Sequence, residues 1–303
     1  MSGLTAMGNF ETLELIWVLV CVRQAGCLVF SAWNNPGDVL LKNPIITLLT
    51  DFGTKDHYVA SMKGVILNTN PRCHLIDITH HVSRHDIREG AFILANAYSH
   101  FPKGTIHLAV VDPGVGGARK PLLLVTPDYY FVGPDNGLFT MIMKNETLEQ
   151  VIALDRPKYH LSNVSTTFHG RDIFAPVAAH LSLGVKPSAL GHRIDLLSWL
   201  GFNGPLNREG KLLGEVLYID AFGNLISDIR EGRLSQFIGK HPFVIRAGGK
   251  TIRSLKKGYW EGKEGEPIAL IGSGGFLEIA IREGSAQKVL KVKRGDPVII
   301  STQ

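Results

Sequence analysis

The sequence predicts an α/β protein whose second part is all β. From residue 45 to residue 186, apolar runs of strand length alternate with stretches of helical spacing, which is typical of an α/β layer with a largely parallel sheet. Beyond residue 186 the helical period disappears, and short apolar runs recur about every ten residues, as in a small barrel or sandwich. A segment rich in Pro, Gly and Asn separates the two patterns.

These patterns divide the chain into four parts. We expect an N-terminal extension of unknown role over 1–44, an α/β domain over 45–186, a linker over 187–210 and a β domain over 211–303. In the β domain, the breaks AGGK and KRGD are expected to be hairpin turns.

The α/β part begins with a strand, IITLLT, followed by a helix in DHYVASMKGVIL and a second strand in CHLIDIT. Asp86 is expected to cap a helix in DIREGAFILANAYSHF. Three strands should follow, in IHLAVVD, KPLLLVTP and YYFVG. The last helix, GRDIFAPVAAHLSLG, is expected to be capped by Asp172 and to end at Gly184.

Composition favours a mildly basic enzyme. The 303 residues are 45% hydrophobic and 19% charged, which are ordinary values for a folded soluble protein. The net charge is +5, but the chain has no block of five Lys or Arg and no RNA-recognition or zinc-finger signature, so we expect no nucleic-acid partner. Its three cysteines form no CxxC pair, which suits a reducing compartment and predicts a cytoplasmic protein.

The N-terminal extension contains an apolar run of eight residues, Leu15 to Val22. A membrane span needs roughly 20 such residues, so we expect no membrane association. A secretory signal begins with positive residues, whereas Glu11 and Glu14 precede this run and no Lys or Arg does. We expect a loosely docked or artefactual segment; a degenerate signal or anchor and a packed helix remain alternatives.

The stretch VVDPGVGGARK, residues 110–120, has glycines where a nucleotide-binding loop would have them. However, Arg119 stands where the third glycine of a dinucleotide fingerprint belongs, and no Gly-Lys-Ser/Thr follows. The loop also comes after the third expected strand, whereas the fingerprint follows the first. The glycines would let the backbone approach a ligand closely without any phosphate.

Acidic residues end two of the expected parallel strands. Asp51 ends the first strand and Asp112 the third, and open α/β sheets bind ligands just beyond such ends. A carboxylate there can accept hydrogen bonds from both hydroxyls of a ribose, which is the role we assign to Asp51. Each acid could instead be a turn or helix cap, and Asp112 with Arg119 could be an ion pair that only stiffens the loop.

Histidines give a weaker signal. His169 stands in TTFHGRDIF, just before an expected helix, but most of the 12 histidines must be structural. A metal site could be suspected at His74, His80, His81 and His85. No HExxH motif or Cys/His spacing accompanies them, so we expect no metal.

Six motifs, spread in order over about residues 45–301, together resemble one family: TDFG, IDITH, VVDPGVGGARK, GPDNGLF, FHGRDIF and FGNLISD. The chain is similar to the S-adenosyl-L-methionine (SAM) hydrolases, or SAM hydroxide adenosyltransferases, which are related to the SAM-dependent fluorinase and chlorinase. The resemblance implies that water attacks C5′ of SAM and releases adenosine and L-methionine. It implies no cofactor, since SAM is the substrate. It also implies a homotrimer whose sites lie between one subunit's α/β domain and its neighbour's β domain.

The resemblance places the family's hydrolytic triad on Asp112, Arg119 and His169, converging on one water beside C5′. Asp112 or His169 could accept the proton of that water, and the sequence leaves the choice open. The ribose acid matches Asp51. The other substrate contacts implied by the resemblance are Asp56, His57 and Tyr58 near the sulfonium or methionine side, Asp220 and Ser273 on the methionine moiety, Asn224, Ala280 and Arg282 on the adenine side, and Tyr259 stacked on adenine.

Two other functions remain open from the sequence. One is a non-catalytic adenosine or SAM sensor in which the triad is structural. The other is a halogenase of the same fold. The halogenating relatives carry tyrosine at the position of Asp112 and serine at that of Gly170, and the fluorinase has a long insertion that is absent from LLLVTPDYYFVG. These three differences favour water over halide as the nucleophile.

Overall fold

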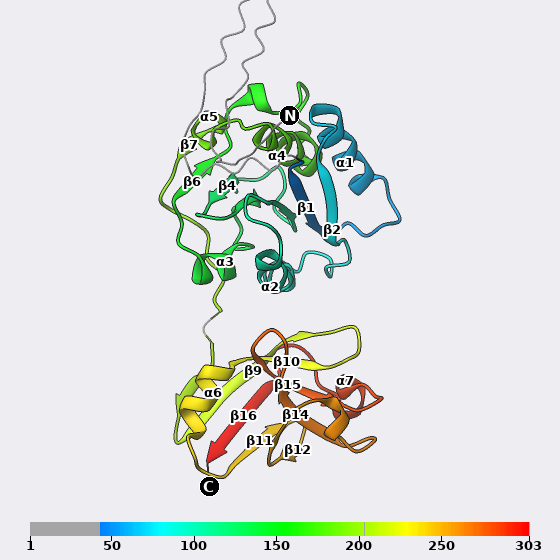
Figure 1. The fold of residues 1–303 in the computed structure, drawn as a ribbon, viewed down its shortest axis with the longest axis vertical. Helices are drawn as coiled ribbons and strands as arrows, with labels where there is room; N and C mark the ends of the chain where they lie inside the picture. The colour runs from blue at the N-terminus through cyan, green and yellow to red at the C-terminus, as the bar shows by residue number, and fades with distance from the viewer. Residues whose placement is uncertain (1–42, 203, 303) are drawn as a thin grey trace, which may run out of the picture. The chain divides into compact units, whose positions relative to one another are not determined.

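The computed structural model describes residues 43–202 and 204–302 and contains two sheets (Figure 1). The expectations for the N-terminal extension, including its apolar run, lie outside the described residues apart from Asn43 and Pro44. The α/β part consists of β1 (Ile45–Thr50), α1 (Tyr58–Thr69), β2 (His74–Thr79), α2 (Ile87–Ala97), β3 (Ile106–Val110), β4 (Pro121–Val125), β5 (Tyr130–Pro134), α3 (Thr140–Asn145), β6 (Gln150–Ala153), the π-helix η3 (Gly170–Phe174), α4 (Ala175–Ser182), α5 (Pro187–Leu190) and β7 (His192–Arg193).

The first sheet is mixed. Its strand order is β2-β1-β3-β5-β4-β6-β7. The pairs β1–β2, β1–β3 and β3–β5 are parallel, whereas β4–β5, β4–β6 and β6–β7 are antiparallel. The expected parallel arrangement therefore holds for one half of the sheet, and that half includes the strands that end at Asp51 and Asp112.

Helices cover both faces of this sheet, which makes three layers (Figure 1). Residues of α1 and α4 pack with the sheet in one buried cluster that contains Met62, Ile66 and Val177. Residues of α2 and α3 pack against the opposite face in a second cluster, which contains Leu94 and Ile142. Burial of these apolar side chains, worth about 25 cal/mol per Å² removed from water, holds the strand ends in fixed positions.

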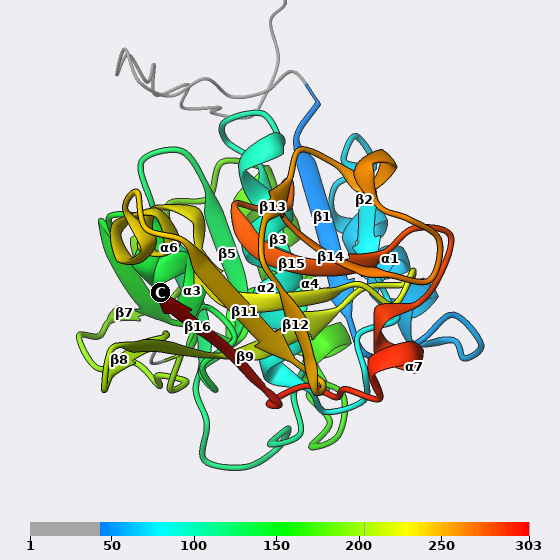
Figure 2. The ribbon, with the colours of Figure 1, turned by 90° about the horizontal axis from the view of Figure 1, so that it is seen from below.

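The second part is rich in strands, as expected. Its elements are β8 (Leu206–Arg208), β9 (Lys211–Ile219), β10 (Leu225–Arg230), α6 (Glu231–Ile238), β11 (Phe243–Ala247), β12 (Lys250–Ile252), β13 (Leu255–Lys256), β14 (Pro267–Ile271), β15 (Phe276–Ile281), α7 (Ala286–Leu290) and β16 (Pro297–Thr302). They form a curled sheet in the order β12-β11-β16-β9-β10-β15-β14-β13, with β8 paired to β9 (Figure 2). Every residue of β15 is buried, so this strand is central to the sheet.

The turn predictions had different outcomes. AGGK joins the antiparallel strands β11 and β12 through Gly248 and Gly249, both at positive φ, so the hairpin is confirmed. The hairpin at KRGD is wrong, because this turn follows helix α7 and leads into β16, which pairs with β9 and β11. The helices α6 and α7, which interrupt the β pattern, were not predicted.

The two helix-cap predictions also differ in outcome. The side chain of Asp86 accepts a hydrogen bond from the backbone N–H of Glu89, so the predicted cap of α2 is confirmed. The predicted cap at Asp172 is wrong. Asp172 lies inside η3, and its carboxylate instead receives the backbone N–H of Ser165. Within the described ranges, every helix is too short or too polar to span a bilayer.

Candidate active site

Two acidic residues emerge from neighbouring parallel strands at the same edge of the first sheet. Thr50 at the end of β1 pairs in register with Val110 at the end of β3, and Asp51 and Asp112 follow within two residues. The carboxyl ends of parallel strands are where open α/β sheets bind ligands. Asp51 and Asp112 therefore lie where the sequence pattern required them.

Asp112, Arg119 and His169 are in direct contact. Arg119 Nε donates to both oxygens of Asp112 at 3.0 Å, and its NH2 group lies 2.5 Å from Asp112 Oδ2. The same NH2 group lies 2.8 Å from His169 Nδ1. The Asp112 and Arg119 side chains are only 4% and 8% exposed, so solvent screens this pair little. The guanidinium also lies over the ring of Phe174, 5.4 Å from its centroid.

This contact defines the protonation of His169. A guanidinium has only donors, so Nδ1 of His169 must accept, and the neutral ring then carries its proton on Nε2. Burial lowers the pKa of His169 and the positive charge of Arg119 lowers it further, while Asp112 and Asp172 act in the opposite direction. The net direction is downward. His169 is therefore a neutral imidazole at pH 7 with an Nε2–H group to donate.

The glycine loop packs closely against the segment that precedes His169. Gly116 has φ +75°, and a Cβ added there would lie 2.1 Å from the carbonyl oxygen of Thr166. No L-residue fits that contact without moving the backbone. Gly116 is thus the position at which the loop of Asp112 and Arg119 can meet the loop of His169.

Asp51 lies beside an aromatic cluster. Its Oδ2 accepts the backbone N–H of His85 at 2.8 Å, and His85 has a positive φ of 65°. Tyr58, the first residue of α1, lies edge-on to Phe168 with ring centroids 5.2 Å apart. Three more ring contacts extend this cluster, between Phe52 and Tyr58, Phe52 and Phe168, and His57 and Tyr58. Asp56, His57 and Tyr58 are exposed at the start of α1.

A second group of the expected residues gathers in the β part. Asp220 Oδ1 accepts the backbone N–H groups of Phe222 and Asn224, and its Oδ2 accepts from the Asn224 amide at 2.9 Å. Ala280 is fully buried on β15, next to Ile268 on β14. The other members are exposed: Ser273 is in the turn between β14 and β15, and Arg282 follows β15 beside Glu283.

Glu278 belongs to this second group and was missed from the sequence. The hydroxyl of Tyr259 donates to Glu278 Oε1 at 2.7 Å, and Glu278 is only 6% exposed. Burial raises the pKa of Glu278 despite this hydrogen bond, and the charge of Asp220 adds to the rise. The only signal was the single acid in the otherwise apolar run FLEIAI, because an acid at a buried strand position needs a partner.

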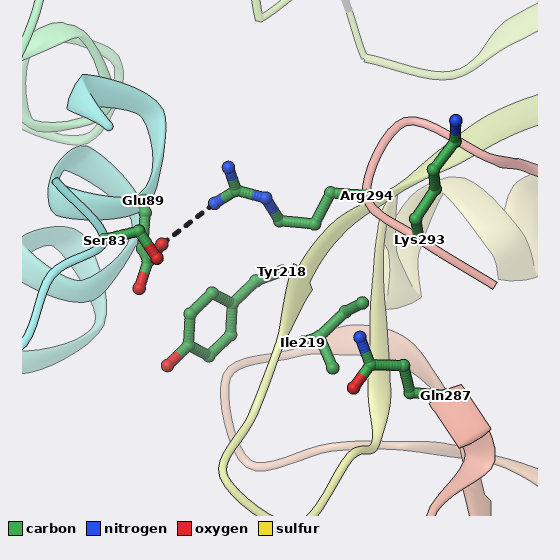
Figure 3. Close-up of a pocket in the computed structure, with 7 residues that line it drawn as sticks. All are labelled: Ser83, Glu89, Tyr218, Ile219, Gln287, Lys293 and Arg294. Carbon is green, nitrogen blue, oxygen red and sulfur yellow. Dashed lines mark hydrogen bonds and ion pairs between the residues drawn. The ribbon is translucent and has the colours of Figure 1, made fainter. Parts of the chain in front are cut away.

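Across residues 43–202 and 204–302, none of the hydrogen bonds, ion pairs or ring contacts joins the triad to Asp220, Asn224 or Tyr259. A polar cleft of about 400 Å³ contains none of the predicted site residues. Figure 3 shows it lined by Glu89, Tyr218 and Arg294, with Arg294 donating to Glu89 at 3.0 Å.

The suspected histidine cluster is dispersed into structural roles. His80 contacts Thr50 through Nδ1 and Asp77 through Nε2, and His81 donates its backbone N–H to Thr79. In the part of the chain that the structure describes, no group of three or more His, Cys, Asp or Glu is arranged to hold a metal ion.

Comparisons with known proteins identify relatives along most of the chain. Residues 46–191 match the SAM hydroxide adenosyltransferase N-terminal domain, and residues 214–299 match the C-terminal domain of the same name. The chain is 37% identical to an (R)-S-adenosyl-L-methionine hydrolase of Thermus thermophilus, over 84% of this chain and 98% of that one. It is 36% identical to a hydrolase of the same name from Methanocaldococcus jannaschii, over 84% and 95%. An uncharacterized conserved protein of Thermotoga maritima has a similar structure, with TM-score 0.79 and 37% identity over 84% of this chain and 99% of that chain.

Proposed function

Because the chain belongs to the SAM hydroxide adenosyltransferase family, we propose that it hydrolyses (R)-S-adenosyl-L-methionine, with water attacking C5′ to give adenosine and L-methionine. The structural observation that carries this proposal is the contact of Asp112, Arg119 and His169 at the carboxyl edge of the parallel strands. SAM is the substrate, and the reaction as written needs no cofactor.

The chemistry explains why such a trio is useful. The sulfonium of SAM leaves as a neutral thioether, so the leaving group needs no acid. Water, in contrast, is a weak nucleophile that must be held about 3 Å from C5′, opposite sulfur, while it loses a proton. Positioning can contribute roughly 7 to 11 kcal/mol, and a general base two to four powers of ten in rate.

We assign a different role to each member of the trio. His169 donates its Nε2–H to the oxygen of the attacking water, because its Nδ1 is occupied by Arg119. Asp112 accepts the proton that the water releases, since its carboxylate is the remaining acceptor of the three. Arg119 positions the other two residues through the N–H donors of its planar guanidinium.

The surrounding residues would bind the substrate. Asp51 would accept hydrogen bonds from the ribose hydroxyls. The exposed start of α1, with Asp56, His57 and Tyr58, would face the sulfonium or methionine side. In the β part the proposed assignments are Asp220 and Ser273 for the methionine moiety, Asn224, Ala280 and Arg282 for the adenine side, and Tyr259 for stacking on the adenine ring.

We further propose that the site is shared between subunits of a homotrimer. Among the described residues of one chain, the triad makes no direct contact with Asp220, Asn224 or Tyr259. This supports a shared site, because a closed cycle of identical heterologous contacts would bring each α/β part to a neighbour's β part. We propose a catalytic domain over 45–186, a linker over 187–210 and a β domain over 211–303, in which the ends of the linker pair with the two sheets through β7 and β8. We also propose that the protein is cytoplasmic, since its proposed substrate, SAM, is an intracellular metabolite.

The test of the activity is direct. The purified protein is incubated with SAM, and adenosine and L-methionine are measured with time. Tight adenosine binding without turnover would support the sensor instead. Formation of a 5′-halo-adenosine on addition of chloride or fluoride would support the halogenase.

The test of the shared site uses complementation. Asp112→Ala and Asp220→Ala variants are each expected to be inactive, one in each half of the site. Mixing them 1:1 with subunit exchange should restore about one quarter of the sites. An intact site needs Asp112 from an Asp220→Ala subunit and Asp220 from a neighbouring Asp112→Ala subunit, and each is present with a chance of about one half. No recovery after verified exchange would place both halves in one chain.

A further inference from the structure

A buried carboxylate lies just behind the triad histidine. Asp172 follows His169 by three residues and has a fully buried side chain. It belongs to the π-helix η3, which begins immediately after His169. Acidic side chains are almost never fully buried unless they are paired, and π-turns are frequently found at functional sites. Both features indicate that this position serves more than helix formation.

Asp172 forms hydrogen bonds with the segment that leads into His169 and with Arg171. Its Oδ2 accepts the backbone N–H of Ser165 at 2.8 Å, and its backbone carbonyl accepts the N–H of Leu161 at 2.9 Å. Ser165 Oγ in turn accepts the N–H of Phe168 at 3.0 Å. On the other side, Arg171 Nε donates to Asp172 Oδ1 at 2.6 Å.

The held segment also packs against the loop that carries the other two members of the triad. Thr166 comes directly after Ser165, and its carbonyl is the atom that packs against Gly116 in the loop of Asp112 and Arg119. A continuous set of contacts thus runs from the buried carboxylate through Ser165 and Thr166 to that loop.

Charge adds a second connection. The charged and titratable groups that act on His169 are Arg119, Asp112 and Asp172, and His160 is coupled to it as well. Burial alone would raise the pKa of Asp172, but the hydrogen bonds from Arg171 and Ser165 outweigh it, so the pKa lies below its usual value. Asp172 is therefore a fixed negative charge near the imidazole.

We propose that Asp172 is a positioning residue of this site. It holds segment 161–168 so that His169 Nδ1 meets Arg119, and its negative charge partly offsets the positive charge of Arg119 at the imidazole. Only the expected effect on kcat rests on the proposed hydrolysis. The geometric and electrostatic parts concern the free protein.

The test is Asp172→Asn, an isosteric change that removes the charge. We expect kcat to fall about 10- to 100-fold, as for a small misplacement of a reacting group, while the dissociation constant of adenosine changes less than about threefold. NMR titration of the histidine rings should show the pKa of His169 displaced further downward. The control is Asp195→Asn, an exposed acid near Arg193, which should leave kcat, the adenosine affinity and the His169 titration unchanged.

Opposite results overturn the proposal. A folded Asp172→Asn variant with wild-type kcat and an unchanged His169 titration excludes the positioning role. If that variant does not fold, Ser165→Ala removes the hydrogen bond to Phe168 N and the contact of the Ser165 hydroxyl with Asp172, while Asp172 itself remains. A lower kcat with unchanged adenosine affinity supports the role, and wild-type kcat contradicts it. If the wild-type protein does not turn over SAM, the proposed function fails, and the His169 titration still decides the present proposal.

Discussion

The guanidinium of Arg119 occupies Nδ1 of His169 at 2.8 Å, which leaves the imidazole neutral and able to donate only through Nε2. Protonation of His169 would place a proton at Nδ1, directly against the Arg119 donor. The trio can therefore work only while His169 is neutral.

The first prediction concerns the acid side of the pH–rate profile. Because burial and Arg119 lower the pKa of His169, kcat should stay constant as the pH falls through 6.5, the ordinary histidine pKa, and decline only below it. The measurement is kcat at saturating SAM across this range. An acid limb at or above pH 6.5 would contradict the neutral role of His169.

The second prediction separates chemistry from binding. Asp112→Ala and His169→Ala should each lower kcat by about 10²- to 10⁴-fold, as expected for loss of a proton acceptor or a water donor. Adenosine should still bind, since neither side chain is assigned to the nucleoside. Calorimetry measures adenosine binding, and an assay of SAM turnover measures kcat. Wild-type turnover in either variant would contradict the triad assignment.

The third prediction concerns Asp51. Asp51→Ala should weaken adenosine binding about 10- to 100-fold, because hydrogen bonds to a charged group are worth about 1.5 to 3 kcal/mol. KM for SAM should rise by a similar factor with a smaller change in kcat. Unchanged adenosine affinity, measured by calorimetry, would count against the ribose role.

The fourth prediction tests the close approach of two loops. Gly116→Ala should reduce stability by about 1 to 3 kcal/mol through its positive φ, and the clash with the Thr166 carbonyl should displace the loop and lower kcat. Gly114→Ala is the matched control for stability, since its Cβ would meet only Arg119 Cγ at 3.6 Å. Urea unfolding compares the stability of the Gly116→Ala and Gly114→Ala variants. Equal stability would show that the loop can move to accommodate the added methyl group at no cost.

The fifth prediction concerns His107, a fully buried residue on β3 that contacts Thr47 Oγ1 at 2.8 Å. Burial lowers its pKa to about 3, so below pH 6.5 the unfolded chain binds the proton more strongly than the folded one. This group should therefore cost up to about 1.4 kcal/mol of stability for each pH unit between 6.5 and 3. His107→Gln, which does not titrate, should show a smaller loss in urea unfolding over that range; identical slopes would contradict the assignment.

The sequence predicted the features that depend on local pattern. The apolar runs predicted the strands that end next to Asp51 and Asp112, and these strands are present. Capping chemistry predicted the cap at Asp86, which is also present. The antiparallel half of the first sheet could also have been foreseen. Only residues 126–129 separate β4 from β5, and a parallel crossover needs a dozen or more residues.

Features that depend on tertiary contacts were not accessible from the pattern. Asp172 has the spacing of a helix cap, but its carboxylate reaches back to Ser165 across a π-turn, which no local rule indicates. The partnership of Tyr259 with Glu278 joins residues 19 apart on different elements. In α6, Leu234, Phe237 and Ile238 have the i, i+3, i+4 spacing of an amphipathic helix, but the helix has only 8 residues, so the pattern does not repeat.

The π-helix after His169 accommodates one residue more per turn than a regular helix would. Successive residues of an α-helix are rotated by roughly 100° about its axis. Deleting a single residue within 170–174 would therefore allow ordinary α-helical winding and swing the imidazole by about that angle, away from its guanidinium partner. The number of residues in this one turn therefore contributes to the direction in which His169 points, in addition to the side-chain contacts of Asp172.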